Sequence, residues 1–293
     1  MKKAFFIYLL LALFLAGCSS TAAPAQIAAT TLPVYEFTSR ICEGTPLSVA
    51  RLVTEEVSCL HDYSLNVRQV KAAESADLIV ISGAGLEEFL DDILVDTNTI
   101  DASRNITLLT PEVHHHDHDE SGHEGHHHEE DPHIWLSPAN AGIMAYNICS
   151  GLTEMYPQYA DTFAENLQSL QKDLNVLQQY AEQELSELSC RDLITFHDGF
   201  SYLAQAFDLT ILEAIEEESG SEASAKELIH MIEEVKHHQL PAIFTEKSGS
   251  VSAAGIIARE TGAQEFILDM AMAGDSYFDA MYHNINTLKE ALQ

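Results

Sequence analysis

The chain has 293 residues, of which 46% are hydrophobic and 20% charged, and 46 Asp and Glu against 14 Lys and Arg give a net charge of −32. This composition is that of a globular protein and excludes disorder throughout, and the length predicts two domains. So acidic a surface repels phosphate backbones, which excludes nucleic acid as a main partner.

The N-terminus carries an export signal. Two lysines precede an apolar run from Ala4 to Leu15, which is shorter than the ~20 residues needed to span a bilayer. The run ends in a Leu-Ala-Gly-Cys sequence that resembles the lipobox of bacterial lipoproteins, in which the cysteine is lipidated. We therefore predict a signal peptide over residues 1–17, a flexible tether over 18–26 and an extracytoplasmic protein anchored to a membrane through Cys18.

Two similar α/β halves follow, each with four short apolar or β-branched runs separated by helix-like segments. This alternation predicts a four-stranded, mainly parallel sheet in each half. We place an N-terminal α/β lobe at residues 27–156 and a C-terminal α/β lobe at residues 190–293. The predicted strands are Ile27–Leu32, Leu47–Val53, Leu78–Ser82 and Ile106–Leu109 in the first lobe, and Leu193–Phe196, Thr210–Ile215, Ala242–Thr245 and Phe266–Leu268 in the second.

A long helix is predicted between the two lobes, over residues 157–189. It begins near Pro157, a favoured residue at helix starts, and would be roughly 45 Å long at ~1.5 Å per residue. Its apolar residues recur at steps of three and four, which defines one buried face. They are Phe163, Leu167, Leu170, Leu174, Leu177, Ala181, Leu185 and Leu188. A helix of this length is able to brace both lobes.

An acidic, His-rich segment at residues 112–131 interrupts the first lobe. It has eight histidines, eight acidic residues and almost no apolar residues, so it cannot bury a core and is predicted to be a mobile loop. We expect it to be an auxiliary metal-binding segment. Its histidines are His114, His115, His116, His118, His123, His126, His127 and His128.

Residues His123 to His127 also match the H-E-x-x-H pattern of zinc metalloproteases. That pattern requires a stable helix, on which two histidines one turn apart hold zinc. Here two glycines interrupt a run that has no apolar face, so we interpret the match as accidental.

Four further residues are candidates for a metal site because they follow predicted strands. His61 follows the second strand, His133 follows the fourth through the His-rich segment, His197 ends the fifth and Asp269 ends the eighth. Ligands of open parallel sheets lie outside the carboxyl ends of the strands. Three imidazoles and one carboxylate suit a tetrahedral site for Zn²⁺.

At these positions the sequence resembles the substrate-binding proteins of bacterial zinc-uptake ABC transporters. The similarity covers nearly all of the mature chain, including a His-rich segment before the second histidine. The segments that carry it are His61-Asp62-Tyr63-Ser64-Leu65, Ala76-Asp77-Leu78, Gly83-Ala84-Gly85-Leu86-Glu87, Asp131-Pro132-His133-Ile134-Trp135-Leu136-Ser137-Pro138, Thr195-Phe196-His197-Asp198-Gly199-Phe200, Glu222-Ala223-Ser224-Ala225-Lys226-Glu227-Leu228 and Ile243-Phe244-Thr245-Glu246.

The resemblance implies two α/β lobes joined by a long rigid helix, with the metal in the cleft between them. It also implies that His61, His133 and His197 ligate Zn²⁺ and that Asp269 takes the fourth, more variable position. Manganese- and iron-type relatives have a carboxylate where His197 stands, which favours zinc. The implied protein is not an enzyme: it is a monomer that delivers Zn²⁺ to an ABC permease in the cytoplasmic membrane. Gly199 stands where alanine is usual in the family, and we expect it to loosen the backbone beside His197.

Several alternatives remain open at this level. Glu246 or water could replace Asp269 as the fourth ligand, and the cargo could be manganese, iron or nickel. An open coordination position would instead suit a zinc hydrolase. Cys42 and Cys59 are our preferred disulfide pair, whereas a bridge between Cys149 and Cys190 is not favoured.

Overall fold

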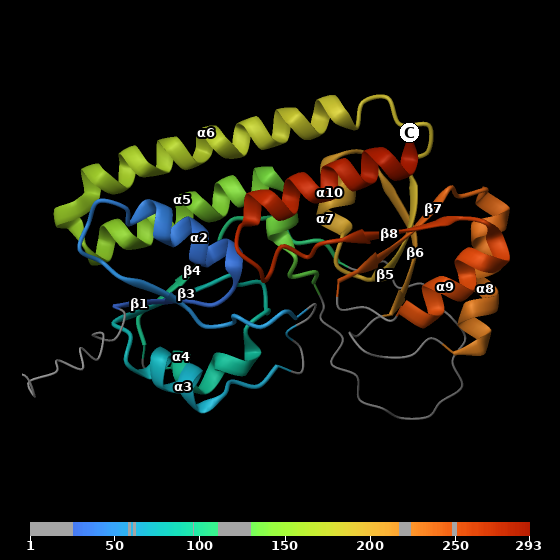
Figure 1. Cartoon of the computed structure of the whole chain (residues 1–293). Helices are drawn as coiled ribbons and strands as arrows, with labels where there is room; N and C mark the ends of the chain where they lie inside the picture. The colour runs from blue at the N-terminus through green and yellow to red at the C-terminus, as the bar shows by residue number, and fades with distance from the viewer. Residues whose placement is uncertain are drawn as a thin grey trace, which may run out of the picture.

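The computed structural model describes residues 26–57, 60, 63–95, 97–110, 130–216, 224–247 and 251–293. Two α/β lobes lie side by side, and one long helix, α6, runs along both (Figure 1). The signal peptide, Cys18, Cys59, His61 and the histidines of the His-rich segment lie outside the described residues, so those predictions are not tested here. Within the described part of the chain, no helix is long and apolar enough to cross a membrane.

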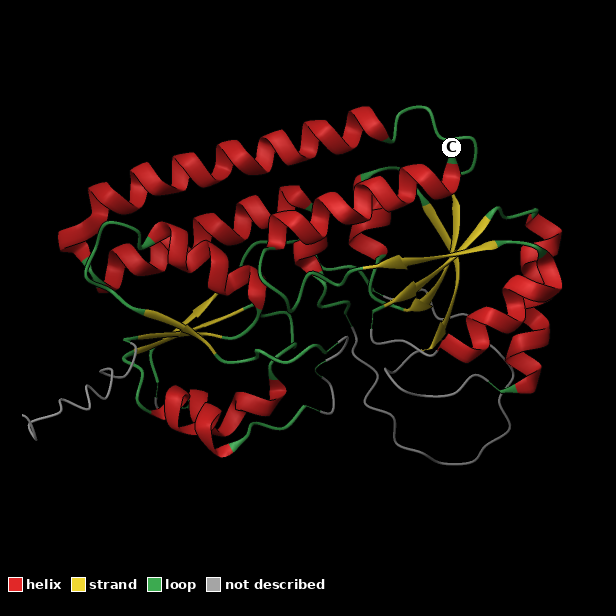
Figure 2. Ribbon diagram, viewed as in Figure 1, coloured by secondary structure: helices red, strands yellow, loops and turns green. Residues whose placement is uncertain are grey.

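The N-terminal lobe is built on a parallel sheet with the strand order β2-β1-β3-β4. Helices cover both faces of this sheet, with α2 and α5 on one side and α3 and α4 on the other (Figure 2). The elements are β1 Ile27–Ala29, α2 Leu32–Ile41, β2 Val49–Arg51, α3 Val67–Glu74, β3 Leu78–Ile81, α4 Asp91–Leu94, β4 Thr99–Asp101 and α5 Pro138–Met155, with short 3₁₀ turns η1 Glu88–Leu90 and η2 Ile134–Leu136.

The prediction of the fourth strand at Ile106–Leu109 was wrong. The strand that pairs with β3 is β4, seven residues earlier, with Ile79 opposite Thr99. The backbone of the predicted run makes other bonds: Ile106 N–H donates to Ser103 O in a turn, and Leu109 N–H donates to a tyrosine hydroxyl of the other lobe. This run is therefore a connection that passes between the lobes.

The C-terminal lobe repeats the same arrangement, with the strand order β6-β5-β7-β8 and parallel pairing throughout. All four predicted strands are confirmed with small changes at their ends. The elements are β5 Asp192–His197, α7 Ser201–Ala206, β6 Thr210–Glu216, α8 Ala225–His238, β7 Ala242–Glu246, α9 Val251–Thr261, β8 Gln264–Leu268 and α10 Tyr277–Leu292. A capping box between Ser224 and Glu227 starts α8.

The predicted linking helix is confirmed in position. A 3₁₀ turn, η3 Pro157–Tyr159, leads into α6 Ala160–Glu184, which has 25 residues and is therefore about 38 Å long. It buries Phe163, Leu170, Leu174, Leu177 and Ala181, as the periodicity predicts. This face packs on α2 and α5 of the N-terminal lobe and on α10 of the C-terminal lobe (Figure 1). The helix thus braces both lobes.

A short segment after β8, residues 269–277, attaches the C-terminal lobe to the N-terminal lobe. Leu32 N–H donates to Met272 O at 3.0 Å, and Arg51 Nη1 donates to Gly274 O at 2.7 Å. Tyr277 adds two bonds, because its N–H donates to a carboxylate on α2 and its hydroxyl donates to Trp135 O. The apolar core is continuous across the lobes, from Ile27 to Leu292.

The cysteines that the structure describes are free thiols. Cys42 and Cys149 are buried, and Cys190 is partly buried. Burial, with a smaller effect of the neighbouring Cys149, raises the pKa of the Cys42 thiol to about 12. The Cys42–Cys59 bridge stays a prediction, since Cys59 lies outside the described residues.

Candidate metal centre

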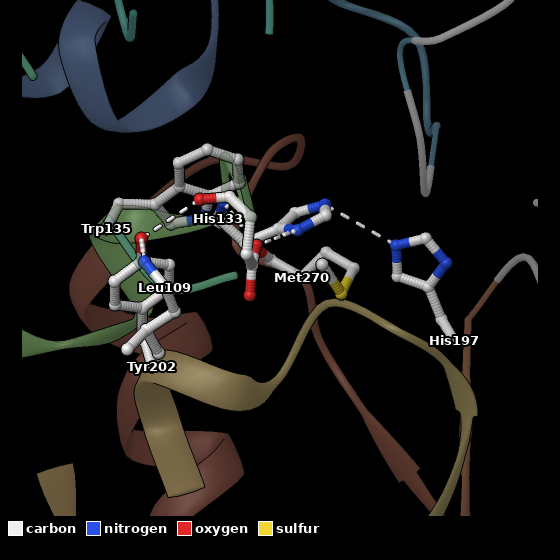
Figure 3. Close-up of polar contacts among 7 residues, drawn as sticks. Leu109, His133, Trp135, His197, Tyr202 and Met270 are labelled. Atoms are coloured by element: carbon white, nitrogen blue, oxygen red, sulfur yellow. Dashed lines mark hydrogen bonds and ion pairs between the residues drawn. The ribbon is translucent and has the colours of Figure 1, made fainter. Parts of the chain in front are cut away.

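Two of the predicted ligands, His133 and His197, face each other at the boundary between the lobes (Figure 3). His197 is the last residue of β5, and His133 immediately precedes η2 in the other lobe. Both side chains are buried, each with 2% of its surface exposed. The His133 Nε2 atom lies 3.4 Å from the His197 Nε2 atom.

This separation matches two ligands of one zinc ion. Zn–N bonds of ~2.0–2.1 Å at a tetrahedral angle place the two nitrogens about 3.3–3.4 Å apart. The geometry is thus suitable for a metal ion coordinated by one imidazole from each lobe. Within the described ranges, no group of three or more His, Cys, Asp or Glu residues converges as a metal site. His133, His197 and Asp269 all lie within those ranges and do not form such a group. His61, the expected third nitrogen ligand, lies outside them.

Asp131 fixes the orientation of His133. Its Oδ1 atom accepts the His133 backbone N–H at 2.9 Å and lies 2.8 Å from His133 Nδ1. A carboxylate at Nδ1 holds the proton on that nitrogen and leaves the Nε2 lone pair for a metal, which is the usual outer arrangement of metal-binding histidines. Asp131 therefore holds both the backbone and the ring of His133 in place.

Tyr202 of α7 braces this unit from the C-terminal lobe (Figure 3). Its hydroxyl accepts the Leu109 N–H at 2.9 Å and donates to Asp131 O at 3.0 Å. Burial raises the pKa of Tyr202 to about 12, so the hydroxyl keeps its proton at physiological pH. Asp131 N–H also donates to Leu109 O at 2.7 Å. These bonds tie Leu109, which precedes the His-rich segment, and Asp131, its last residue, to each other and to Tyr202 of the C-terminal lobe.

Trp135 and Met270 pack around the two imidazoles. The Trp135 ring contacts the His133 ring edge to face, and its Nε1 donates to Met270 O at 2.7 Å. A Cβ atom at Gly199 would lie 2.6 Å from His197 Cδ2 and 2.7 Å from Met270 Cε. Gly199 therefore provides the space in which the His197 ring and the Met270 side chain lie, a steric role that the sequence did not indicate.

Asp269 follows β8 and is held in place on several sides. Asn284 of α10, which is fully buried, accepts the Asp269 N–H and donates to Asp269 O, both at 2.7 Å. Oδ1 accepts the Ala271 N–H at 2.8 Å, and Oδ2 accepts a hydrogen bond from the Lys247 ammonium. The structure thus shows Asp269 in an ion pair beside the cleft. Its assignment as the fourth ligand stays a prediction.

A small pocket lies next to this ion pair. Glu56 and Val57 line it from the N-terminal lobe, and Glu246, Lys247, Asp269, Met270, Met272 and Ala273 line it from the C-terminal lobe. Glu246 is buried at the end of β7, as expected for the rival ligand. The pocket therefore gathers carboxylates of both lobes around one lysine.

The match to a family model decides the relationship of this chain to known proteins. The model of the periplasmic zinc-uptake complex component A, ZnuA, matches residues 27–291. The chain belongs to the ZnuA family. This family is one of transporter components, and the match includes both lobes and the linking helix.

Individual relatives of the ZnuA family agree with this assignment. The chain is 30% identical to the zinc-binding lipoprotein AdcA of Streptococcus pneumoniae serotype 4, over 96% of this chain and 59% of that protein. The chain thus spans about three-fifths of the length of that curated relative. A crystal structure of ZnuA is 29% identical with a TM-score of 0.77, over 92% of this chain and all of that one. A structure of Zn(II)-bound AdcA from S. pneumoniae is 27% identical with a TM-score of 0.76, over 92% of this chain and 58% of that one.

Three residues with roles at the centre were missed by the sequence analysis: Tyr202, Lys247 and Asn284. No spacing or motif marks them, because their partners lie 71, 22 and 15 residues away in the chain. For Asp131 the one available signal was its position in the motif, two residues before the predicted ligand His133.

Proposed function

We propose that this protein is the extracytoplasmic zinc-binding component of an ABC-type importer and delivers Zn²⁺ to a permease in the cytoplasmic membrane. The observation that supports this most directly is the pair of buried imidazoles, whose Nε2 atoms are 3.4 Å apart. Membership of the ZnuA family and the names of its zinc-binding relatives support zinc as the cargo.

The proposed site comprises His61, His133 and His197, with Asp269 as the fourth ligand. Neutral imidazoles favour Zn²⁺ over the hard cations, and a carboxylate completes a tetrahedral site. In the proposed site Asp269 fills the fourth position, which leaves no place for the activated water of a zinc hydrolase. The proposed protein therefore binds and releases its metal without catalysing a reaction.

Anchoring and oligomeric state complete the proposal. Lipidation of Cys18 attaches the protein to the outer side of the membrane that contains the permease, and it acts as a monomer. Proteolysis and mass spectrometry of the membrane fraction check the anchor, since a diacylglycerol on Cys18 adds a defined mass to the N-terminal peptide.

The metal assignment is tested by metal content and by competition. Protein purified without added metal is analysed by mass spectrometry, and zinc affinity is then measured in competition with Mn²⁺ and Ni²⁺. We expect zinc to be retained and to outcompete both ions. Displacement of Zn²⁺ by Mn²⁺ would refute zinc as the cargo.

The site assignment is tested by single alanine variants. His61→Ala, His133→Ala and His197→Ala should each weaken zinc binding strongly, because a folded site presents converged ligands. His237→Ala is the matched control, since this histidine is exposed at the end of α8. Unchanged zinc affinity in all three variants would show that the metal binds elsewhere.

A further inference from the structure

The parallel pairing of β7 with β8 places Lys247 beside Asp269. Glu246 and Leu268 are the last paired residues of these strands and lie opposite each other. One residue further along, the backbone leaves each strand, so Lys247 and Asp269 are neighbours at the carboxyl ends of β7 and β8. The Lys247 Nζ atom is 2.5 Å from Asp269 Oδ2.

The two partners differ in mobility. Asp269 is 13% exposed, and its backbone is clamped by Asn284. Lys247 is 52% exposed and reaches the carboxylate with a flexible stem. Of the two donors on the carboxylate, the Ala271 N–H belongs to the backbone, so Lys247 is the one that a new cation is able to displace.

The charge around Lys247 comes from both lobes. The hydrogen bond and charge of Asp269, with the charge of Glu56 from the N-terminal lobe, raise the pKa of Lys247 despite its partial burial. The pocket also contains the buried Glu246. The ammonium is the one cationic group among the described residues that line this pocket, and it offsets the mutual repulsion of the carboxylates.

We propose that Lys247 is a built-in competitor of the metal: its ammonium holds the Asp269 carboxylate until Zn²⁺ displaces it. This inference rests on the proposed zinc site. The competition lowers the affinity for zinc, and when the metal leaves, the ammonium returns to the carboxylate. Lys247 is therefore a residue that sets affinity and eases release of the cargo, with no contact to the metal itself.

The test compares zinc binding by the full chain and by Lys247→Met, which keeps an unbranched side chain of similar length and removes its charge. We expect Lys247→Met to bind zinc about two- to fivefold more tightly, the range that a half-exposed ion pair supports. Zinc transfer to a chelator should slow by a similar factor. The variant should fold, because half of the lysine side chain is solvent-exposed.

Lys289→Met is the matched control. Lys289 of α10 forms an ion pair of the same length with Glu184 at the end of α6. Neither Lys289 nor Glu184 lines the pocket that contains Asp269, so this variant should retain the affinity of the original chain. An equal gain in Lys289→Met would show a general charge effect and overturn the proposal.

A double variant separates the mechanism from other effects of Lys247. In an Asp269→Asn background, Lys247→Met should no longer tighten zinc binding, since the shared carboxylate is gone. A gain that persists in this background overturns the proposal. The proposal is also overturned if Lys247→Met has unchanged zinc affinity while His133→Ala and His197→Ala lose zinc. That result leaves the proposed function intact. Unchanged affinity in the histidine variants would instead refute the proposed site.

Discussion

Replacing Asp131 should weaken zinc binding without changing any metal ligand. The Asp131 Oδ1 atom accepts both the N–H and the ring Nδ1–H of His133, and both residues are almost fully buried. Asp131→Ala removes the acceptor of both bonds, so the ring loses its fixed proton and orientation. Loss of such an outer partner typically costs 10–100-fold in metal affinity, which is the range we expect here.

Asp131→Asn separates charge from geometry. The Asp131 Oδ2 atom has no hydrogen-bond partner in the described part of the chain, so an amide nitrogen is able to take its place while Oδ1 keeps both bonds. A bond to a charged acceptor is stronger than a neutral one by about 1 kcal/mol, which corresponds to about fivefold in affinity. We therefore expect Asp131→Asn to lie between the original chain and Asp131→Ala.

The assay is a competition titration against a fluorescent zinc chelator at pH 7.5, with the visible spectrum of the Co²⁺-loaded protein as a measure of ligand geometry. Asp173→Ala is the control, because Asp173 is exposed on α6 and pairs with Arg40 of α2. Circular dichroism checks that each variant is folded. A folded Asp131→Ala variant with the original zinc affinity would refute the role of Asp131 in orienting His133.

Three further predictions concern protons, stability and the His-rich segment. Zinc affinity should fall steeply below pH ~6.5, since imidazolium does not bind metal; a flat affinity between pH 7.5 and 5.5 would favour carboxylate ligands. Burial raises the pKa of Glu87 from 4.5 to about 7, so its contribution to folding is complete below 4.5 and is lost as pH rises through 7. Relative to Glu87→Gln, the original chain should lose about 3 kcal/mol of unfolding free energy over this range, measured by denaturant titration; parallel pH profiles would contradict this. Deleting residues 112–130 should lower total zinc stoichiometry and leave one tight site, because a sequence with almost no apolar residues to pack offers no preorganised ligand set; loss of the tight site in a folded variant would place the centre in that segment.

The sequence was sufficient for the elements whose side chains repeat regularly. The spacing of Phe163, Leu170 and Leu177 identified α6, and the apolar run before His197 identified β5, which ends at this predicted ligand. The short strand β4 was missed because Thr99–Asp101 has one apolar residue, and its pairing with β3 alone makes it a strand. Ile106–Leu109 looked more like a strand, but its backbone pairs with no described strand of the sheet, and its apolar side chains pack into or against the core cluster.

At the candidate metal centre, sequence position identified two predicted ligands that the structure brings together, and it missed the residues that hold the surrounding backbone and side chains in place. His133 and His197 follow strand or motif rules, and the structure brings them together. The roles of Tyr202, Lys247 and Asn284 depend on which strands and helices pack together, and this requires the fold. Asp269, the predicted fourth ligand, is the clearest example, because the register of β7 and β8 determines which lysine pairs with it.

The continuous core has a consequence for the molecule as an engineering scaffold. Side chains from both lobes, from Ile27 through Trp135 to Leu292, pack into one apolar cluster, and residues 269–277 complete the surface of the opposite lobe. A lobe produced alone would expose this apolar surface to water and lose the partners of its buried polar groups. The lobes are thus not interchangeable modules, because in a chimera that takes one lobe from a relative the apolar side chains of the two lobes would not pack together. Calorimetry of the intact chain should record one cooperative unfolding transition rather than two.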